Sequence, residues 1–159
     1  MKKFILLICI LLINFIIYGQ ERNSLNDIIN HSLNLYVNKV DTLVEKRTIV
    51  KKFFQEKYVN MDGYPLNFIL DNNLKKELKQ IRLFDDVYLK NILKKGTYVI
   101  FFDGIDLKSN RIILSFSSRY VILKKGGLNI SISDGGVYTY EYSNEKQEWY
   151  LIEEKYIGI

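Results

Sequence analysis

The sequence predicts an α+β domain, and two observations carry this prediction. From Ser24 to about Lys46 the apolar residues recur at spacings of three and four, which is the period of one amphipathic helix. From Thr97 onward, short β-rich runs alternate with turn residues such as Gly, Asn, Asp and Ser. Such short connections join antiparallel neighbours, because parallel strands need longer crossovers. We therefore expect an N-terminal amphipathic helix packed on a curved antiparallel sheet of four to six strands.

The N-terminus has the pattern of a secretory signal peptide. Two lysines precede an apolar run of 15 residues, Phe4–Tyr18, and Gly19 offers a small residue before a cleavage point. As a helix the run reaches only ~22 Å, against ~30 Å for the hydrocarbon core of a bilayer. We predict a signal peptide over 1–19 and a single exported domain over 20–159, periplasmic or secreted after passage through the inner membrane. The alternative is an uncleaved signal anchor in the membrane.

Composition excludes several classes of function. The only cysteine, Cys9, lies in the predicted leader, and the only histidine is His31. Disulfide frameworks, Cys/His zinc sites and thiol nucleophiles are thereby excluded, and we predict no metal and no cofactor. His31 points away from the apolar stripe of its helix, so we interpret it as a surface residue. The net charge of +5 falls to +3 without the two leader lysines, which does not indicate a nucleic-acid partner.

The first half of the domain is built from a helix, a strand and a turn. Ser24 followed by Asp27 resembles a capping box, so the long helix is expected to begin there. Residues 48–59 change to a β-rich pattern and are predicted as a strand. Asp62 and Gly63 then supply a turn, and Pro65 forces an extended conformation on the residue before it.

Two short elements follow, of which one is ambiguous. Leu74, Leu78 and Ile81 fall on one face of a predicted short helix, for which Asp71 or Asn72 is the cap. Residues 86–95 fit a helix that ends at Gly96 nearly as well as a strand. The remainder is predicted as a meander of five β runs, which are Tyr98–Ile105, Arg111–Leu123, Leu128–Ser133, Val137–Tyr142 and Gln147–Tyr156.

Asp103 and Asp106 are the closest approach to a paired-carboxylate motif. Two acids three residues apart could bind a cation or share acid and base roles, although calcium loops need more oxygen ligands. Asp and Gly dominate turns for backbone reasons, so we interpret residues 103–106 as the turn at the end of a hairpin. Residues 134–136, Asp-Gly-Gly, receive the same interpretation.

Aromatic residues are dense in the last two predicted strands. Tyr138, Tyr140 and Tyr142 share one face of their strand, and Trp149 and Tyr150 occupy opposite faces of the next. If the tyrosine face is exposed, it is a stacking platform for sugars or for an extended partner chain. If it is buried under the helix, it is core. Large aromatics mostly contribute hydrophobic area, so core or core edge is the stronger interpretation, and Tyr138, Tyr140, Tyr142 and Trp149 remain the candidate binding residues.

The order of elements resembles that of cystatin-like and NTF2-like domains, an analogy at the level of fold that transfers no activity. Our first hypothesis is a non-enzymatic exported binding or accessory protein of the bacterial cell envelope, whose partner is an envelope protein or glycan. We expect the membrane to be involved only through the leader. The alternatives are a carboxylate-dependent hydrolase of a surface glycan, with Asp103 and Asp106 as its acids, and an exported protein that neutralises a toxin.

Overall fold

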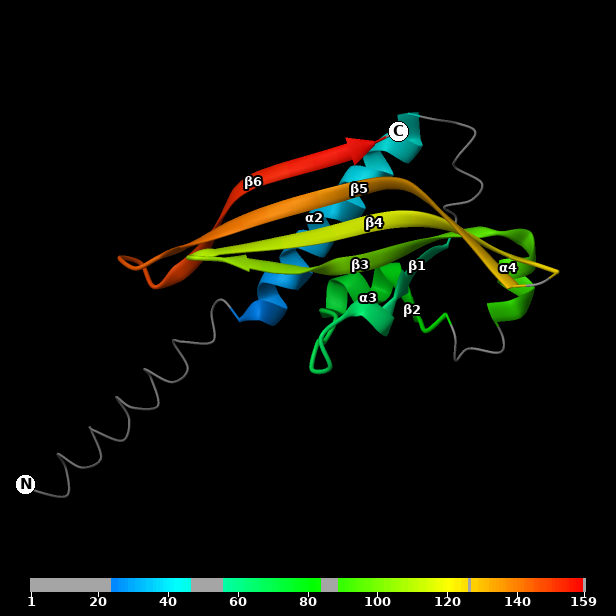
Figure 1. Ribbon diagram of the computed structural model, residues 1–159, viewed down its shortest axis with the longest axis horizontal. Coiled ribbons are helices and arrows are strands. Elements are labelled where there is room, and N and C mark those ends of the chain that lie inside the picture. Colours follow the sequence, from blue (N-terminus) through cyan, green and yellow to red (C-terminus); the bar gives the residue numbers. More distant parts are fainter. Residues whose placement is uncertain (1–23, 47–55, 84–88, 126, 159) are drawn as a thin grey trace, which may run out of the picture.

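The computed structural model describes residues 24–46, 56–83, 89–125 and 127–158. One long helix crosses the broad face of a six-stranded sheet (Figure 1), and shorter elements lie toward one edge. In chain order the elements are α2 (Leu25–Lys46), β1 (Lys57–Asn60), η3 (Met61–Gly63), α3 (Asn72–Glu77), β2 (Leu78–Ile81), α4 (Lys90–Lys95), β3 (Thr97–Lys108), β4 (Arg111–Lys124), β5 (Gly127–Ser143) and β6 (Glu148–Gly158).

The α+β class and the helix that precedes the sheet are as predicted, but the sheet is mixed. Its strand order is β2-β1-β3-β4-β5-β6, and β3 to β6 form an antiparallel meander. At the other edge β1 runs parallel to both β2 and β3, which the prediction of an antiparallel sheet missed. Residues 61–77, which contain α3, provide a connection long enough for a parallel crossover.

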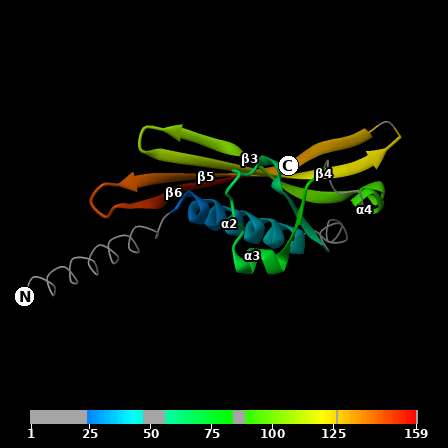
Figure 2. The same ribbon diagram turned by 90° about the horizontal axis from the view of Figure 1, so that it is seen from below.

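Helix α2 begins where the sequence predicts and covers the face of the meander. The Ser24 amide donates to the Asp27 carboxylate at 3.1 Å and the Asp27 amide donates to the Ser24 hydroxyl at 3.2 Å, which is a reciprocal capping box. Its buried stripe consists of Ile28, Ile29, Leu33, Tyr36, Val37 and Val40. This stripe joins side chains of β3, β4 and β5 in the main core. Figure 2 shows α2 and α3 on the same side of the sheet.

A second, smaller core lies on the opposite face at the end of the sheet near α4. Neighbouring side chains of a strand point to opposite faces, so Ile100 joins the main core while Val99 joins the second. The second cluster comprises Tyr58, Ile81, Leu83, Leu89, Leu93, Val99 and Val121. The rest of this face is not covered by any described helix, and we call it the open face.

The short elements differ from the prediction in their extent. Asp71 caps α3, as predicted, because its carboxylate accepts from the amides of Asn73 and Leu74. The helix ends at Glu77, however, and Leu78 belongs to β2 because parallel pairing with β1 satisfies its backbone. Of the strand predicted over 48–59, the described part begins at Lys57, and 47–55 lie outside the described residues.

The ambiguous segment before Gly96 contains a helix. It is α4, and Gly96 follows it with a φ of 77°, a conformation that favours glycine. Residues 84–88 lie outside the described residues, so only residues 89–95 of the segment are placed. Tyr64 is extended before Pro65, with φ −81° and ψ 154°, as the proline requires.

Two of the predicted turns are strand interior. Residues 134–136 lie inside β5, so the runs Leu128–Ser133 and Val137–Tyr142 are one strand rather than two. Residues 103–106 lie inside β3, where the pairing with β4 shifts register between Phe102 and Gly104. Glycine suits a β-bulge just as it suits a turn, so Gly104 is compatible with both structures. The β3–β4 reversal lies at Ser109, which has a φ of 53°.

The predicted leader, residues 1–19, lies outside the described residues. Among the residues that are described, no helix is both long enough and apolar enough to cross a membrane. Cleavage, anchoring and export therefore stay predictions from the sequence.

Candidate functional site

The four aromatic residues predicted as a platform are divided by the fold. Tyr138 and Tyr140 are 1% and 3% exposed beneath α2, so they belong to the core, the alternative that the sequence favoured. Tyr142 follows Tyr138 and Tyr140 on the same face of β5, and it packs beside Trp149 of β6. Both residues are half-buried, and their ring centroids are 5.2 Å apart. Only these two are placed where a ligand could reach them.

An open groove lies beside Tyr142 at the end of the sheet where β5 turns into β6. It has a volume of about 550 Å³. Its lining residues come from both hairpins at this end and are Asn110, Glu141, Tyr142, Ser143, Lys146, Tyr150 and Ile152. Figure 1 shows the β3–β4 and β5–β6 turns projecting at the same end of the sheet. We call this cavity the hairpin groove.

Strand alternation explains why the groove contains residues outside the predicted aromatic platform. Tyr142 pairs with Trp149 on the helix side of the sheet, while Glu141 pairs with Tyr150 on the open face. The signal is present in the sequence, because strand alternation places Trp149 and Tyr150 on opposite faces. Asn110 was not predictable, because it reaches the groove only through the β3–β4 reversal.

The groove combines charged groups with an aromatic ring. Glu141 accepts from Arg111 at 3.1 Å and from the Asn110 amide at 3.3 Å, and both contacts use the same carboxylate oxygen. The Lys146 ammonium lies 5.0 Å from the centroid of the Tyr150 ring. Lys146 makes no ion pair with a carboxylate of the described residues, and it faces Tyr150, whose hydroxyl donates to Glu148.

The predicted acid pair is held by two separate cations. Asp103 forms an ion pair with Arg119 and accepts from the Ser117 hydroxyl at 3.0 Å. Asp106 pairs with Lys108 at 3.0 Å. No group of three His, Cys, Asp or Glu side chains that could hold a metal ion occurs among residues 24–46, 56–83, 89–125 and 127–158. The arrangement of these acids is that of structural ion pairs.

His31 is exposed, as predicted, but one ring nitrogen is engaged. Its Nδ1 lies 2.7 Å from the buried Tyr140 hydroxyl, and that hydroxyl lies 3.0 Å from the Ser32 hydroxyl. Burial raises the pKa of Tyr140 above its usual value. Tyr140 thus joins α2 to β5 through two polar contacts, a role that the helical periodicity alone did not reveal.

A second buried tyrosine fastens the middle of α2. The Tyr36 hydroxyl lies 2.8 Å from the Ser118 hydroxyl and donates to the Asp134 carboxylate. Burial raises the pKa of Tyr36 strongly, and the neighbouring negative charge of Asp134 raises it further. The aspartate that the sequence suggested as a turn residue is therefore a hydrogen-bond partner of the helix.

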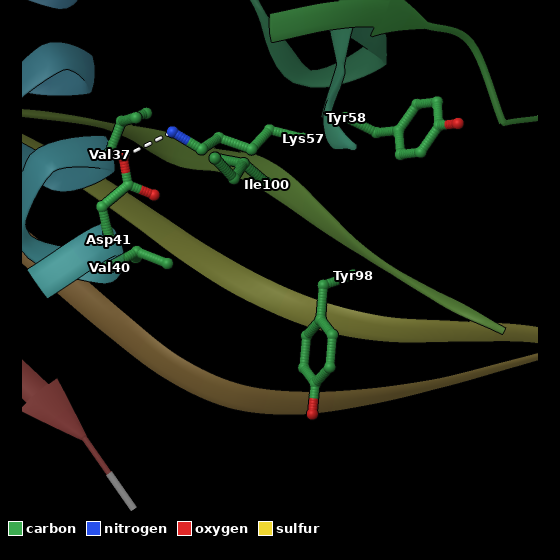
Figure 3. A pocket seen from close by; sticks show the side chains of 7 residues that line it. All are labelled: Val37, Val40, Asp41, Lys57, Tyr58, Tyr98 and Ile100. Carbon is green, nitrogen blue, oxygen red and sulfur yellow. Dashed lines mark hydrogen bonds and ion pairs between the residues drawn. The ribbon is translucent and has the colours of Figure 1, made fainter. Parts of the chain in front are cut away.

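A small crevice between α2 and β1 also contains a charged residue. Figure 3 shows Lys57 reaching Asp41 of α2, and Lys57 also pairs with Glu77 of α3. Burial opposes the charge of Lys57, but the two carboxylates outweigh it and raise the lysine pKa. The crevice measures about 10 Å³, the size of one water, so we assign it a structural role.

No family model, curated protein or solved structure matches this chain. The analogy with cystatin-like and NTF2-like domains therefore rests on the order of elements alone.

Proposed function

We propose that this chain is an exported, non-enzymatic binding protein of the bacterial cell envelope and that the hairpin groove is its ligand site. The observation that carries the proposal is the lining of the groove. It places a tyrosine ring, an amide, a hydroxyl, a carboxylate and an ammonium around one open cavity of about 550 Å³. Such a mixture of an aromatic surface with a few polar groups is typical of small-ligand sites.

A glycan fits this lining better than an apolar ligand does. The hydroxyls of a sugar bond to amide and carboxylate groups, which Asn110 and Glu141 supply, while the apolar face of a sugar ring packs on an aromatic side chain such as Tyr150. The positive charge of Lys146, which forms no ion pair with a described carboxylate, favours a glycan that carries a carboxylate. We therefore propose an acidic envelope glycan as the ligand class.

The hydrolase alternative receives less support, because a general acid and a second carboxylate must face one substrate bond. Asp103 is engaged by Arg119 and Ser117, and Asp106 by Lys108. Neither residue lines the hairpin groove. The toxin-neutralising alternative gains no observation of its own.

The proposal is tested by isothermal titration with soluble peptidoglycan fragments that carry free carboxylates. We expect Tyr150→Ala and Lys146→Ala each to weaken binding at least tenfold, a loss of about 1.4 kcal/mol. Lys94→Ala, an exposed lysine of α4 outside the groove, is the matched control and should bind as the unchanged chain does.

Recovery of the fragments unchanged after long incubation is the second part of the prediction. Equal affinity in the groove variants and the control would place the ligand elsewhere. Cleavage of the fragments that disappears in Asp103→Asn would establish the hydrolase instead.

A further inference from the structure

The loop Pro65–Leu70, between η3 and α3, displays apolar side chains to solvent. Leu66 is 105% exposed and Ile69 is 64% exposed, while Leu70 is 1% exposed and fixed in the core. Phe68 stacks on Tyr64 with ring centroids 4.4 Å apart. The exposed residues are therefore carried by a segment that is anchored through its neighbours, and we call this segment the apolar loop.

Hydrogen bonds fasten the apolar loop to the first turns of α2. The Asn26 side chain accepts from the Ile69 amide at 2.8 Å. The Asn30 side chain donates to the Ile69 carbonyl at 2.9 Å and accepts from the Asp71 amide at 2.9 Å. The backbone around Ile69 is thus satisfied by two asparagines, one of which is buried.

This anchoring holds two large apolar side chains in water at a defined position. A loop with a purely structural role would do as well with polar residues at Leu66 and Ile69, because both are exposed and neither belongs to a core cluster. An exposed apolar pair on a fastened backbone is instead a feature of surfaces that contact a membrane or a partner.

In place of the expectation that only the leader contacts the membrane, we propose that the apolar loop docks on the surface of the bilayer across which the chain is exported, with Leu66 and Ile69 entering the interface. The predicted leader ends its apolar run at Tyr18, seven residues before Leu25, and seven extended residues span at most about 25 Å. Since Asn26 and Asn30 hold the loop against the first turns of α2, the loop lies at the described residues that follow the leader most closely in sequence.

The charge of the neighbouring helix also favours the bilayer surface as the partner of the apolar loop. Lys75 and Lys76 are exposed in α3, the element that directly follows the apolar loop; of the acids beside them, Asp71 caps the helix and Glu77 is paired with Lys57. Anionic lipid headgroups attract lysines near the bilayer surface, and the two apolar side chains add the hydrophobic contribution. A combination of a short apolar insertion with a basic neighbour is typical of peripheral membrane contacts.

The experiment uses the full chain in vesicles of phosphatidylcholine and phosphatidylglycerol. Leu66→Trp in a Trp149→Phe background places a single tryptophan at the loop, and Ile132→Trp, which replaces a residue 62% exposed in β5, is the matched control. We expect lipids brominated on their acyl chains to reduce the Leu66→Trp fluorescence at least twofold and to leave the control unchanged. Absence of quenching at position 66, or equal quenching at both positions, overturns the proposal.

The contribution of the loop is separated from that of the leader with chain from which signal peptidase has removed the leader. In vesicle flotation, Leu66→Ser combined with Ile69→Ser should lower the bound fraction at least tenfold, and Lys75→Glu with Lys76→Glu should act in the same direction. A dimer that dissociates in the double serine variant, with no vesicle binding, would identify a second copy as the occupant and overturn the membrane proposal. The groove variant Tyr150→Ala should leave flotation unchanged, so this test is independent of the proposed glycan site.

Discussion

Buried tyrosine hydroxyls differ in whether they have a hydrogen-bond partner, and this difference decides whether each hydroxyl stabilises or destabilises the fold. Tyr36 has hydrogen-bond partners in Ser118 and Asp134. The hydroxyl of Tyr64 has no hydrogen-bond partner within the described residues, although its ring is stacked between Phe68 and Phe102. A buried hydroxyl without a partner costs free energy, because it gives up its hydrogen bonds to water.

Tyr64→Phe is therefore expected to raise the free energy of unfolding by about 1 kcal/mol, since it removes the unsatisfied hydroxyl and keeps the stacked ring. The matched change Tyr36→Phe should lower it by about 1–3 kcal/mol, because it removes the hydrogen bonds between the Tyr36 hydroxyl and the side chains of Ser118 and Asp134. Urea unfolding of both variants measures the two values. A destabilised Tyr64→Phe would mean that its hydroxyl has a partner.

His31 provides a second prediction from single residues. The Ser32 hydroxyl faces two oxygens, the Ile28 carbonyl at 2.9 Å and the Tyr140 hydroxyl at 3.0 Å. A hydroxyl has one proton and a carbonyl has none. All three contacts are hydrogen bonds at once only if Ser32 donates to Ile28, Tyr140 donates to Ser32, and His31 Nδ1 donates to Tyr140.

We therefore expect neutral His31 to carry its proton on Nδ1 and to present a free Nε2 to solvent. Nitrogen-15 NMR of the imidazole above pH 8 distinguishes the two tautomers. In Tyr140→Phe the preference for Nδ1–H should disappear, because the acceptor is gone. A proton on Nε2 in the unchanged chain would contradict this assignment.

Much of the residue chemistry was accessible from the sequence because it is local. The capping box of Ser24 and Asp27 and the cap at Asp71 each involve residues no more than three apart. The contact of His31 with Tyr140 joins residues 109 positions apart, so no local pattern could indicate it.

At the scale of elements, glycines within β5 explain why one strand was predicted as two. A Cβ on Gly136 would lie 2.7 Å from a ring carbon of Tyr36 and 3.1 Å from one of Tyr138. The glycine therefore permits close approach of the helix to the sheet, whereas its sequence context predicts a turn residue. Glycine serves in turns and at sites of close packing within a strand. Which of the two applies depends on the side chain that packs over the glycine.

Gly136→Ala should accordingly destabilise the chain by about 1–3 kcal/mol through overpacking against Tyr36. The neighbouring Gly135→Ala is the matched control, because its Cβ would meet only the Phe116 carbonyl, at 3.3 Å. Thermal unfolding of the two variants should give the larger loss for Gly136→Ala. Similar losses of stability in both variants would show that the destabilisation comes from the change in strand flexibility and not from the contact with Tyr36.

Across the whole molecule, the sequence predicted the helix and the meander better than the parallel edge. Helix α2 and the strands that contain Val99 and Val121 are long, so their hydrophobic patterns repeat often enough to distinguish a helix from a strand. Strands β1 and β2 are four residues long, and such short apolar runs fit a helix or a strand equally well. The hairpin groove lies between two turns, and its residues come together only through the register of β4, β5 and β6.

The buried tyrosines also predict how the molecule as a whole responds to pH. Burial raises the pKa of Tyr36, Tyr64 and Tyr138 in the folded chain, while an unfolded tyrosine has a pKa of about 10. The folded state therefore holds more protons above pH 10, and the stability that these groups contribute is complete below that pH and is lost as the pH rises further.

We expect tyrosinate absorbance to appear in two stages, with these three phenols ionising only together with loss of the circular dichroism of the fold. Simple titration of all tyrosines near pH 10 with the fold intact would contradict the burial that the core requires.

The central claim, that the hairpin groove binds an acidic envelope glycan, is tested most directly by NMR. Amide spectra of the exported chain would be recorded during addition of carboxylate-bearing peptidoglycan fragments. We predict that shift changes concentrate at Asn110, Glu141, Lys146 and Tyr150 and disappear in Tyr150→Ala. Changes that concentrate instead around Asp103 and Arg119, or no saturable change at any residue, would contradict the account.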